Sequence, residues 1–118
     1  MVQLLSTPAR IPVPGGKIID EHVGRVATHE ERVSVAHMRA PAQWEEPAQT
    51  PDFEEITLVL AGTLYVDHDG GQLVVSAGQA VLARAGERVR YHTGRDGADY
   101  VSVCLPAFAG RLVHREES

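Results

Sequence analysis

The sequence predicts an all-β domain, either a sandwich or a barrel of short strands. Turn signals made of Gly, Pro, Asp and Ser recur roughly every 8–12 residues, the spacing typical of such folds. No segment keeps the apolar period of an amphipathic helix over three turns. The 118 residues are enough for one such domain and too few for two.

The beginning of the chain is rich in turn-forming residues. Residues 1–16 hold three prolines and two glycines, so we predict an irregular N-terminal arm. The run 32–38 carries β-branched residues at alternate positions and is predicted to be a strand. Prolines at both ends of 41–47 mark a loop. We place the barrel at residues 17–108 and a C-terminal tail at 109–118.

The rest of the chain alternates between apolar runs and tight turns. The predicted strands are 55–60, 63–67, 72–75, 80–83, 88–92 and 99–105. Gly62 separates the first two, and 67–71 is a hairpin turn because Asp and Gly tolerate positive φ. Pro106 ends the last strand, and 112–118 form either a short helix or a frayed end.

Composition limits the partners and the compartment. The 16 acidic and 11 basic residues give a net charge of −5, which argues against a nucleic-acid surface. No apolar run approaches the roughly 18–20 residues of a membrane span, and Met1–Arg10 lacks the pattern of a signal peptide. Cys104 is the one cysteine, which favours a reducing cytoplasm. Lys17 is the one lysine, a bias that we attribute to genomic composition.

Glycines form a regular frame around the middle of the chain. Six residues separate Glu55 from Gly62, fifteen separate Gly62 from Gly78, and seven separate Gly78 from Gly86. Strand corners in a small barrel need residues that accept positive φ. The frame resembles the two motifs of small single-domain cupins, G-x5-H-x-H-x3,4-E-x6-G and G-x5-P-x-G-x2-H-x3-N. The resemblance implies a cupin, that is, a double-stranded β-helix or jelly-roll barrel with one open mouth.

Two segments suggest a branch within the cupins. The residue patterns of segments 54–64 and 100–107 look most like those of the ethanolamine-utilisation Q-type cupins. Members of that branch tend to lack the histidine set. The resemblance therefore agrees with the substitutions in the motifs of this chain.

The metal ligands of the cupin motifs are replaced here. Gln49 and Pro51 stand in place of the two histidines of the first motif, and Val89 replaces the histidine of the second. Catalytic sites for zinc, iron and nickel prefer imidazole with a carboxylate. We therefore expect no cofactor, and the alternative is a divalent metal held by Gln49, Glu55 and His92. Strand alternation opposes that alternative, because His92 points outward unless a bulge reverses the parity.

Glu55 is the polar side chain that remains at a ligand position, and we predict it to be the catalytic residue. A carboxylate inside an apolar barrel is desolvated and suited to proton exchange. The alternative is a structural hydrogen-bond network or salt bridge at the barrel mouth. The predicted substrate-binding residues are Trp44, Gln49, Thr57, Val59, Val89 and Tyr91.

Other chemically suggestive residues have simpler interpretations. Arg84, Arg88 and Arg90 cluster around the second motif, and strand alternation favours surface ion pairs for them. Cys104 lies in an apolar strand and is predicted to be an inert buried thiol. Glu45 and Glu46 lie in the loop before the first motif. We predict them to be solvated, as charged loops usually are, and the alternative is that they edge the mouth of the pocket.

The leading hypothesis is a metal-independent cupin enzyme that performs acid–base chemistry on a small metabolite, with Glu55 as proton shuttle. The class would be an isomerase, cyclase, dehydratase or lyase. A metal-dependent, dioxygenase-like cupin and a non-catalytic ligand-binding or scaffolding cupin are the alternatives. Cupins commonly pair, so the resemblance implies a homodimer, formed either through an N-terminal strand or through an outer sheet face. Leu4–Val13 is a candidate for the strand exchange.

Overall fold

The computed structural model describes residues 1–117 and is almost entirely β-structure. The strands are β1 (Ala9–Ile11), β2 (Ile18–Val23), β3 (Ser34–Ala40), β4 (Glu54–His68), β5 (Gly71–Ser76), β6 (Ala80–Ala83) and β7 (Val89–Leu105), and a short helix, α1 (Gly110–Val113), follows. This all-β architecture confirms the predicted fold class.

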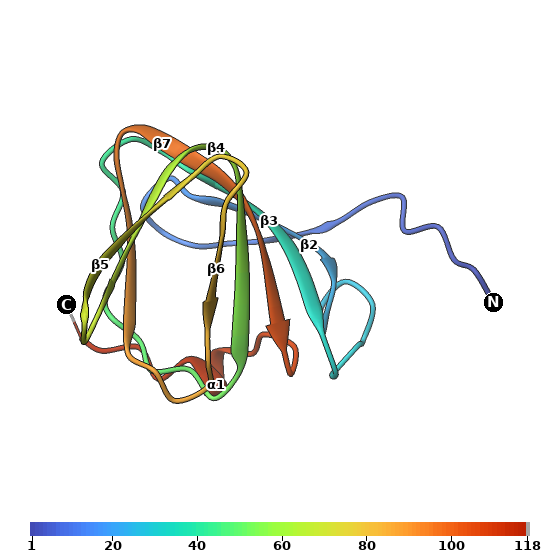
Figure 1. Ribbon diagram of the computed structural model, residues 1–118. Helices are drawn as coiled ribbons and strands as arrows, with labels where there is room; N and C mark the ends of the chain where they lie inside the picture. The colour runs from blue at the N-terminus through green and yellow to red at the C-terminus, as the bar shows by residue number, and fades with distance from the viewer. Residues whose placement is uncertain (118) are drawn as a thin grey trace.

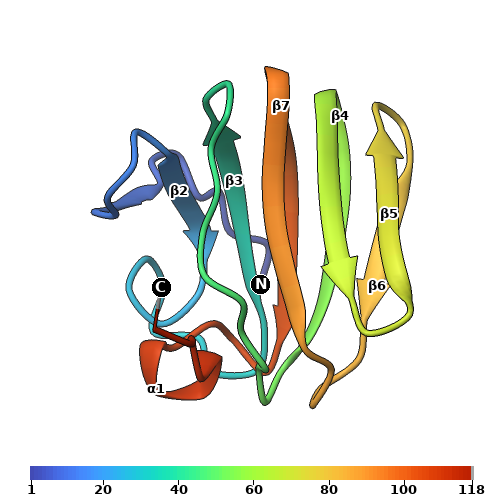
Figure 2. The same cartoon turned by 90° about the vertical axis from the view of Figure 1, so that its left-hand side faces the viewer.

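Two long strands hold the fold together. The strands run in the order β1-β2-β3-β7-β4-β5, with β6 on the other part of β4, and all neighbours are antiparallel. The first half of β4 pairs with β6 and its second half pairs with β5. Because β4 and β7 pass through both layers, the sheet folds back on itself as an open sandwich (Figures 1 and 2).

Glycines produce the bend where β4 and β7 cross between the layers. The β4–β7 register shifts between Val59 and Ala61 and again between Gly62 and Leu64. Gly62 has φ of 75°, and a Cβ there would lie 2.2 Å from the backbone oxygen of Gly97. The sequence analysis was wrong to divide each long strand in two, because the glycines bend the strands without reversing the chain.

The N-terminal region contains more regular structure than predicted. β1 lies inside the arm predicted to be irregular, and it pairs with β2 from Ala9 opposite Glu21 to Ile11 opposite Ile19. β2 itself was not predicted, because polar residues at 20–22 interrupt its apolar pattern. Residues before β1 extend away from the sandwich (Figure 1).

Apolar side chains fill the sandwich in two clusters. The larger contains Ala40, Trp44, Val59, Leu64, Val66, Val75, Ala83, Val89, Tyr91, Ala98 and Tyr100. The smaller joins Phe53, Cys104 and Val113, so α1 is anchored on β7 through an apolar contact. Cys104 is 3 % exposed, which confirms that the thiol is buried. Within residues 1–117, no helix has the length and apolar character needed to cross a membrane.

Candidate functional site

A cavity of about 510 Å³ opens between the two layers. Its walls come from β2, β3, β4 and β7, from the loop that contains Trp44 and Gln49, and from arm residues 11–15. Phe108 and Arg115, from the C-terminal segment of the chain, also line it. This size lies within the usual range of small-molecule pockets, roughly 300–1,000 Å³.

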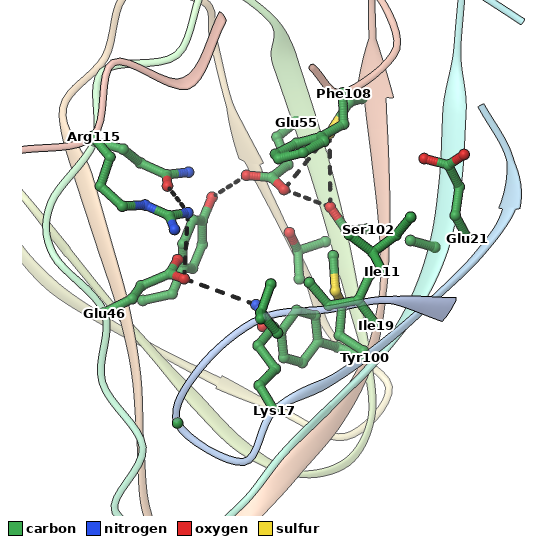
Figure 3. A pocket seen from close by; sticks show the side chains of 18 of the residues that line it. Ile11, Lys17, Ile19, Glu21, Glu46, Glu55, Tyr100, Ser102, Phe108 and Arg115 are labelled. Carbon is green, nitrogen blue, oxygen red and sulfur yellow. Dashed lines mark hydrogen bonds and ion pairs between the residues drawn. The ribbon is translucent and has the colours of Figure 1, made fainter. Parts of the chain in front are cut away.

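Glu55 faces this cavity in a network of hydrogen bonds. The Tyr91 hydroxyl donates to Glu55 Oε1 at 2.9 Å, and the Ser102 hydroxyl donates to Oε2 at 2.5 Å. The Cys104 thiol lies 3.8 Å from the same Oε2. Strand register explains the grouping, because Glu55 of β4 stands opposite Cys104 of β7 and Thr57 stands opposite Ser102. The carboxylate is therefore held in one orientation (Figure 3).

A second polar group contains Lys17, Glu46 and Arg115, here called the Lys17–Glu46–Arg115 cluster. Lys17 Nζ lies 3.9 Å from Glu46 Oε2, and Arg115 Nη2 lies 3.6 Å from the same oxygen. Arg115 also donates a hydrogen bond of 3.0 Å to Gln49 Oε1. One carboxylate oxygen therefore faces two cations that reach it from different segments (Figure 3).

Aromatic rings cover the amine of Lys17. Its Nζ lies 4.4 Å from the centre of the Trp44 ring and 5.5 Å from the centre of the Tyr100 ring. The Lys17 side chain is 9 % exposed, and that of Glu46 is 13 % exposed. Such rings attract a cation through their quadrupoles, although burial removes its hydration.

Burial changes the acid–base behaviour of several cavity groups. It lowers the pKa of Lys17 and raises the pKa of Glu46, so each charged form is disfavoured. The attraction between the two groups opposes both shifts. Burial, followed by the Glu55 charge, raises the pKa of Tyr91, and burial likewise raises the pKa values of Tyr100 and Cys104. The two phenols and the thiol therefore remain protonated at neutral pH.

The structure brings together most of the predicted site residues. Trp44, Gln49, Glu55, Thr57 and Tyr91 line the cavity. Val59 and Val89 do not line it, which corrects their assignment to substrate binding. Both belong to the larger apolar cluster, where they are 0 % and 3 % exposed. Alternation along the strands correctly predicted that both side chains point inward, but it could not show that they pack in the apolar core rather than at the cavity wall.

His92 lies away from the cavity, as strand alternation predicted. Its ring stacks on Tyr65 at 5.4 Å between centroids, and its Nε2 is 3.1 Å from Asp67 Oδ1. Gln49, Glu55 and His92 are therefore not arranged as one ligand set. Residues 1–117 contain no group of three or more His, Cys, Asp or Glu side chains that could hold a metal ion.

The surface arginines form ion pairs, as predicted. Arg84 pairs with Glu54 at 3.0 Å and Arg88 with Glu116 at 2.6 Å. Arg90 bridges Glu45 and Asp67. The prediction for Glu46 was wrong, because this carboxylate is turned into the cavity rather than into solvent.

Sequence reasoning missed Lys17, Ser102 and Arg115. Lys17 had a detectable signal, because a chain that uses arginine almost everywhere keeps one lysine. Ser102 required the β4–β7 register, and Arg115 required the return of the C-terminal segment to the loop at Gln49.

Comparison with known proteins gives both sequence and structural relatives. A family described as the AraC-like ligand binding domain matches residues 33–116. Endoribonuclease YbeY of Myxococcus xanthus strain DK1622 is 46 % identical over 107 residues, which are 90 % of this chain and 36 % of that protein. The chain thus spans about a third of the length of this curated relative.

Solved cupin structures share the fold. Oxalate decarboxylase from Bacillus subtilis superposes with a TM-score of 0.76 at 17 % identity, covering 94 % of this chain and 30 % of the other. A candidate ethanolamine utilization protein Q from Salmonella typhimurium LT2 gives 0.62 at 22 % identity, covering 78 % and 71 %. Another structure of the decarboxylase concerns its Mn(II) centres. Around Glu55 in the present chain, the described residues form no group of three or more His, Cys, Asp or Glu side chains that could hold such an ion.

Proposed function

Because the chain belongs to the AraC-like ligand-binding domains and has a cupin fold, we propose that it binds a small organic molecule in the cavity beside Glu55. The observation that carries the proposal is the combination of apolar walls with oriented polar groups. Ile11, Ile19, Met38 and Phe53 supply apolar surface, whereas Glu55 and the Lys17–Glu46–Arg115 cluster supply charge. A ligand with an apolar body and a polar end fits this pattern.

A cavity-filling variant tests this proposal. Ala36 of β3 lines the cavity, and its neighbour Val35 lies on the opposite face of the same strand. Wild-type protein would be melted with defined sets of small carboxylates, amines and sugars. A ligand at about 100 times its Kd stabilises the folded state by about 2.7 kcal/mol. We expect Ala36→Leu to remove this stabilisation and Val35→Leu to retain it.

Two results would contradict ligand binding in this cavity. One is that no compound in the sets raises the melting temperature of the wild-type protein. The other is that Ala36→Leu, folded as shown by circular dichroism, responds to the same compound as strongly as the wild type.

Acid–base catalysis at Glu55 is a second candidate function. It is favoured by the protonated Tyr91 and Ser102 hydroxyls, which contact the carboxylate and could relay a proton to a bound substrate. For any reaction found with a bound compound, Glu55→Gln should lower kcat by two orders of magnitude or more and leave KM nearly unchanged. Unchanged turnover in a folded Glu55→Gln protein would leave binding as the function.

The name of the longer relative does not determine the activity of this chain. The match covers 36 % of that endoribonuclease. The net charge of −5 and the pairing of Arg84, Arg88 and Arg90 with carboxylates give little attraction for a phosphate backbone. We therefore propose a small-molecule ligand and no nucleic-acid partner, with the cytoplasm as the working compartment.

A homodimer is also part of this proposal. The outer face of the β4–β6–β7 layer exposes Ile56, Leu58, Leu60, Leu82 and Leu105, each 37–50 % accessible. These side chains lie on the side of the sheet opposite the cavity, because they alternate with Glu55, Thr57 and Val59. A second copy of the chain would cover this apolar face. The strand exchange predicted for Leu4–Val13 is less favoured, because β1 already pairs with β2 of its own chain.

A further inference from the structure

Lys17 differs from the other basic residues of the chain. It is the one lysine in 118 residues, and it lines the cavity with its side chain 9 % exposed. Its Nζ faces the carboxylate of Glu46 on one side and the rings of Trp44 and Tyr100 on the others. Figure 3 shows the Lys17 side chain extending toward Glu46 inside the pocket.

The ion pair with Glu46 compensates the Lys17 charge only in part. The Nζ–Oε2 separation of 3.9 Å is longer than a hydrogen bond, and Arg115 approaches the same oxygen more closely, at 3.6 Å. Burial lowers the pKa of Lys17. The charges of Glu46 and Glu55 oppose this shift, and the Arg115 charge adds a smaller lowering. Desolvation and a neighbouring cation are the two conditions that make a lysine amine nucleophilic.

We propose that Lys17 captures a small 2-oxo acid by forming an imine between its Nζ and the carbonyl carbon of the ligand. The inference rests on the proposed function, because it identifies the class of molecule that occupies the same cavity. An arginine could not perform this reaction, which gives a chemical reason for a lysine at this position.

The chemistry needs no external oxidant or reductant. The lone pair of the neutral amine attacks the carbonyl carbon and the C–O π bond breaks. The nitrogen then loses one proton and the oxygen takes one, giving a carbinolamine. A second proton on that oxygen lets it leave as water while nitrogen loses its last proton and the C=N bond forms. Glu46 can donate and recover these protons, because burial raises the pKa of its carboxyl next to Nζ.

The position of Arg115 favours a 2-oxo acid over a simple ketone. In a 2-oxo acid the carboxylate is bonded directly to the carbonyl carbon. Lys17 Nζ and Arg115 Nη2 both lie within 4 Å of Glu46 Oε2, so the amine and the guanidinium can act on adjacent groups of one ligand. A guanidinium binds a carboxylate with paired hydrogen bonds, and the remaining apolar surface can hold a short side chain.

Reductive trapping tests the imine directly. The chain would be incubated with pyruvate and sodium cyanoborohydride, and the products mapped by peptide mass spectrometry. Because the sequence has one lysine, any ε-amine adduct belongs to Lys17, and the α-amine at the start of the chain is an internal reference. We expect Lys17 to be labelled at least tenfold faster than the α-amine. Labelling of Lys17 no faster than that of the α-amine would overturn the proposal.

Variants identify the ligand class and control for folding. Lys17→Arg keeps the charge, cannot form an imine and should show α-amine labelling alone. Methyl pyruvate presents the same ketone without a carboxylate, so wild-type labelling of Lys17 should fall about tenfold, and Arg115→Gln should remove that difference. Equal rates for pyruvate and methyl pyruvate in the wild type would overturn the 2-oxo acid assignment. Mapping on the wild type itself does not depend on whether a variant folds.

The outcome is separable from that of the general binding proposal. If another compound stabilises the protein, Ala36→Leu abolishes that effect, and Lys17 is still not trapped, then the cavity binds ligands and the imine is wrong. If neither binding nor trapping occurs, both proposals fail.

Discussion

At the scale of single residues, the pKa of Glu46 is subject to opposing effects, since burial raises it and two neighbouring cations lower it. Its buried carboxylate faces both Lys17 and Arg115, and a single oxygen interacts with both cations. Burial nevertheless raises its pKa, which means that desolvation outweighs the two attractions. The folded protein therefore holds the Glu46 proton more tightly than the unfolded chain does.

This proton affinity predicts a pH dependence of stability. Since the folded pKa of Glu46 is raised above its ordinary value of 4.5, the folded state binds more protons than the unfolded state just above that pH. The stabilisation from Glu46 is thus complete below pH 4.5 and is lost as the pH rises through the folded pKa. Urea unfolding in half-unit steps from about pH 4.5 upward would measure it.

The matched variant for this measurement is Glu46→Gln. It keeps the size of the side chain and removes the titration, so the difference in unfolding free energy between wild type and variant should change with pH in that window. A difference that stays constant with pH would show that Glu46 is not responsible.

Glu55 shows how far sequence reasoning reaches at this scale. Its motif spacing placed it in a cupin strand, and alternation placed Tyr91 on the inward side of the facing strand. The structure joins these two by a hydrogen bond. Ser102 could not be predicted to join them, because its contact depends on the register of β4 against β7, which involves residues 47 positions apart. The contacts of Lys17 and Arg115 with Glu46 also join segments that are distant in sequence, although Lys17 carried a signal as the one lysine of the chain.

At the scale of elements, the bend in β4 and β7 is the feature on which the cavity depends. The bend lets the two halves of each strand belong to different layers, and the cavity lies between those layers. The glycine spacing marked the location of the bend, but a strand end and a strand bend leave the same pattern in a sequence. The pairing of Gly62 with Ala98 across this region shows that the strand bends and does not end there.

Gly62 and Gly78 have similar backbone angles, but we expect alanine to lower the free energy of unfolding by very different amounts at the two positions. Gly62 and Gly78 have φ of 75° and 85°, so alanine at either adopts a left-handed conformation that costs about 1–2 kcal/mol. At Gly62 the added Cβ also meets the Gly97 oxygen at 2.2 Å, whereas at Gly78 it meets nothing within 4 Å. We expect Gly62→Ala to lose about 3 kcal/mol or more and Gly78→Ala about 1 kcal/mol, measured by denaturant unfolding. Equal losses would show that backbone strain alone sets both.

At the scale of the whole molecule, some exposed apolar residues lie on the outer face of the β4–β6–β7 layer and others lie outside it. Leu58 belongs to the patch proposed as a dimer interface, and Val74 lies on β5, outside that layer. Large contiguous apolar patches on a protein surface usually mark a contact site.

Analytical ultracentrifugation would measure the oligomeric state that this face predicts. We expect a concentration-dependent dimer for the wild type, a monomer for Leu58→Arg and a dimer for Val74→Arg. Val74 is the control position because it is 56 % exposed in the wild type and lies outside the patch. A wild-type protein that stays monomeric at high concentration, or a Leu58→Arg protein that still pairs, would refute the interface.

The cavity joins both ends of the chain, and this has a consequence for the order of folding. Lys17 comes before β2, Arg115 follows α1, and both meet Glu46. Contacts between residues so distant in sequence require large loops to close, which is entropically unfavourable early in folding. If the Lys17–Glu46–Arg115 cluster assembles after the rate-limiting step, Arg115→Ala should accelerate unfolding and leave the refolding rate unchanged in a stopped-flow chevron. A ligand bound at this cluster would then lower the unfolding rate and leave the folding rate unchanged.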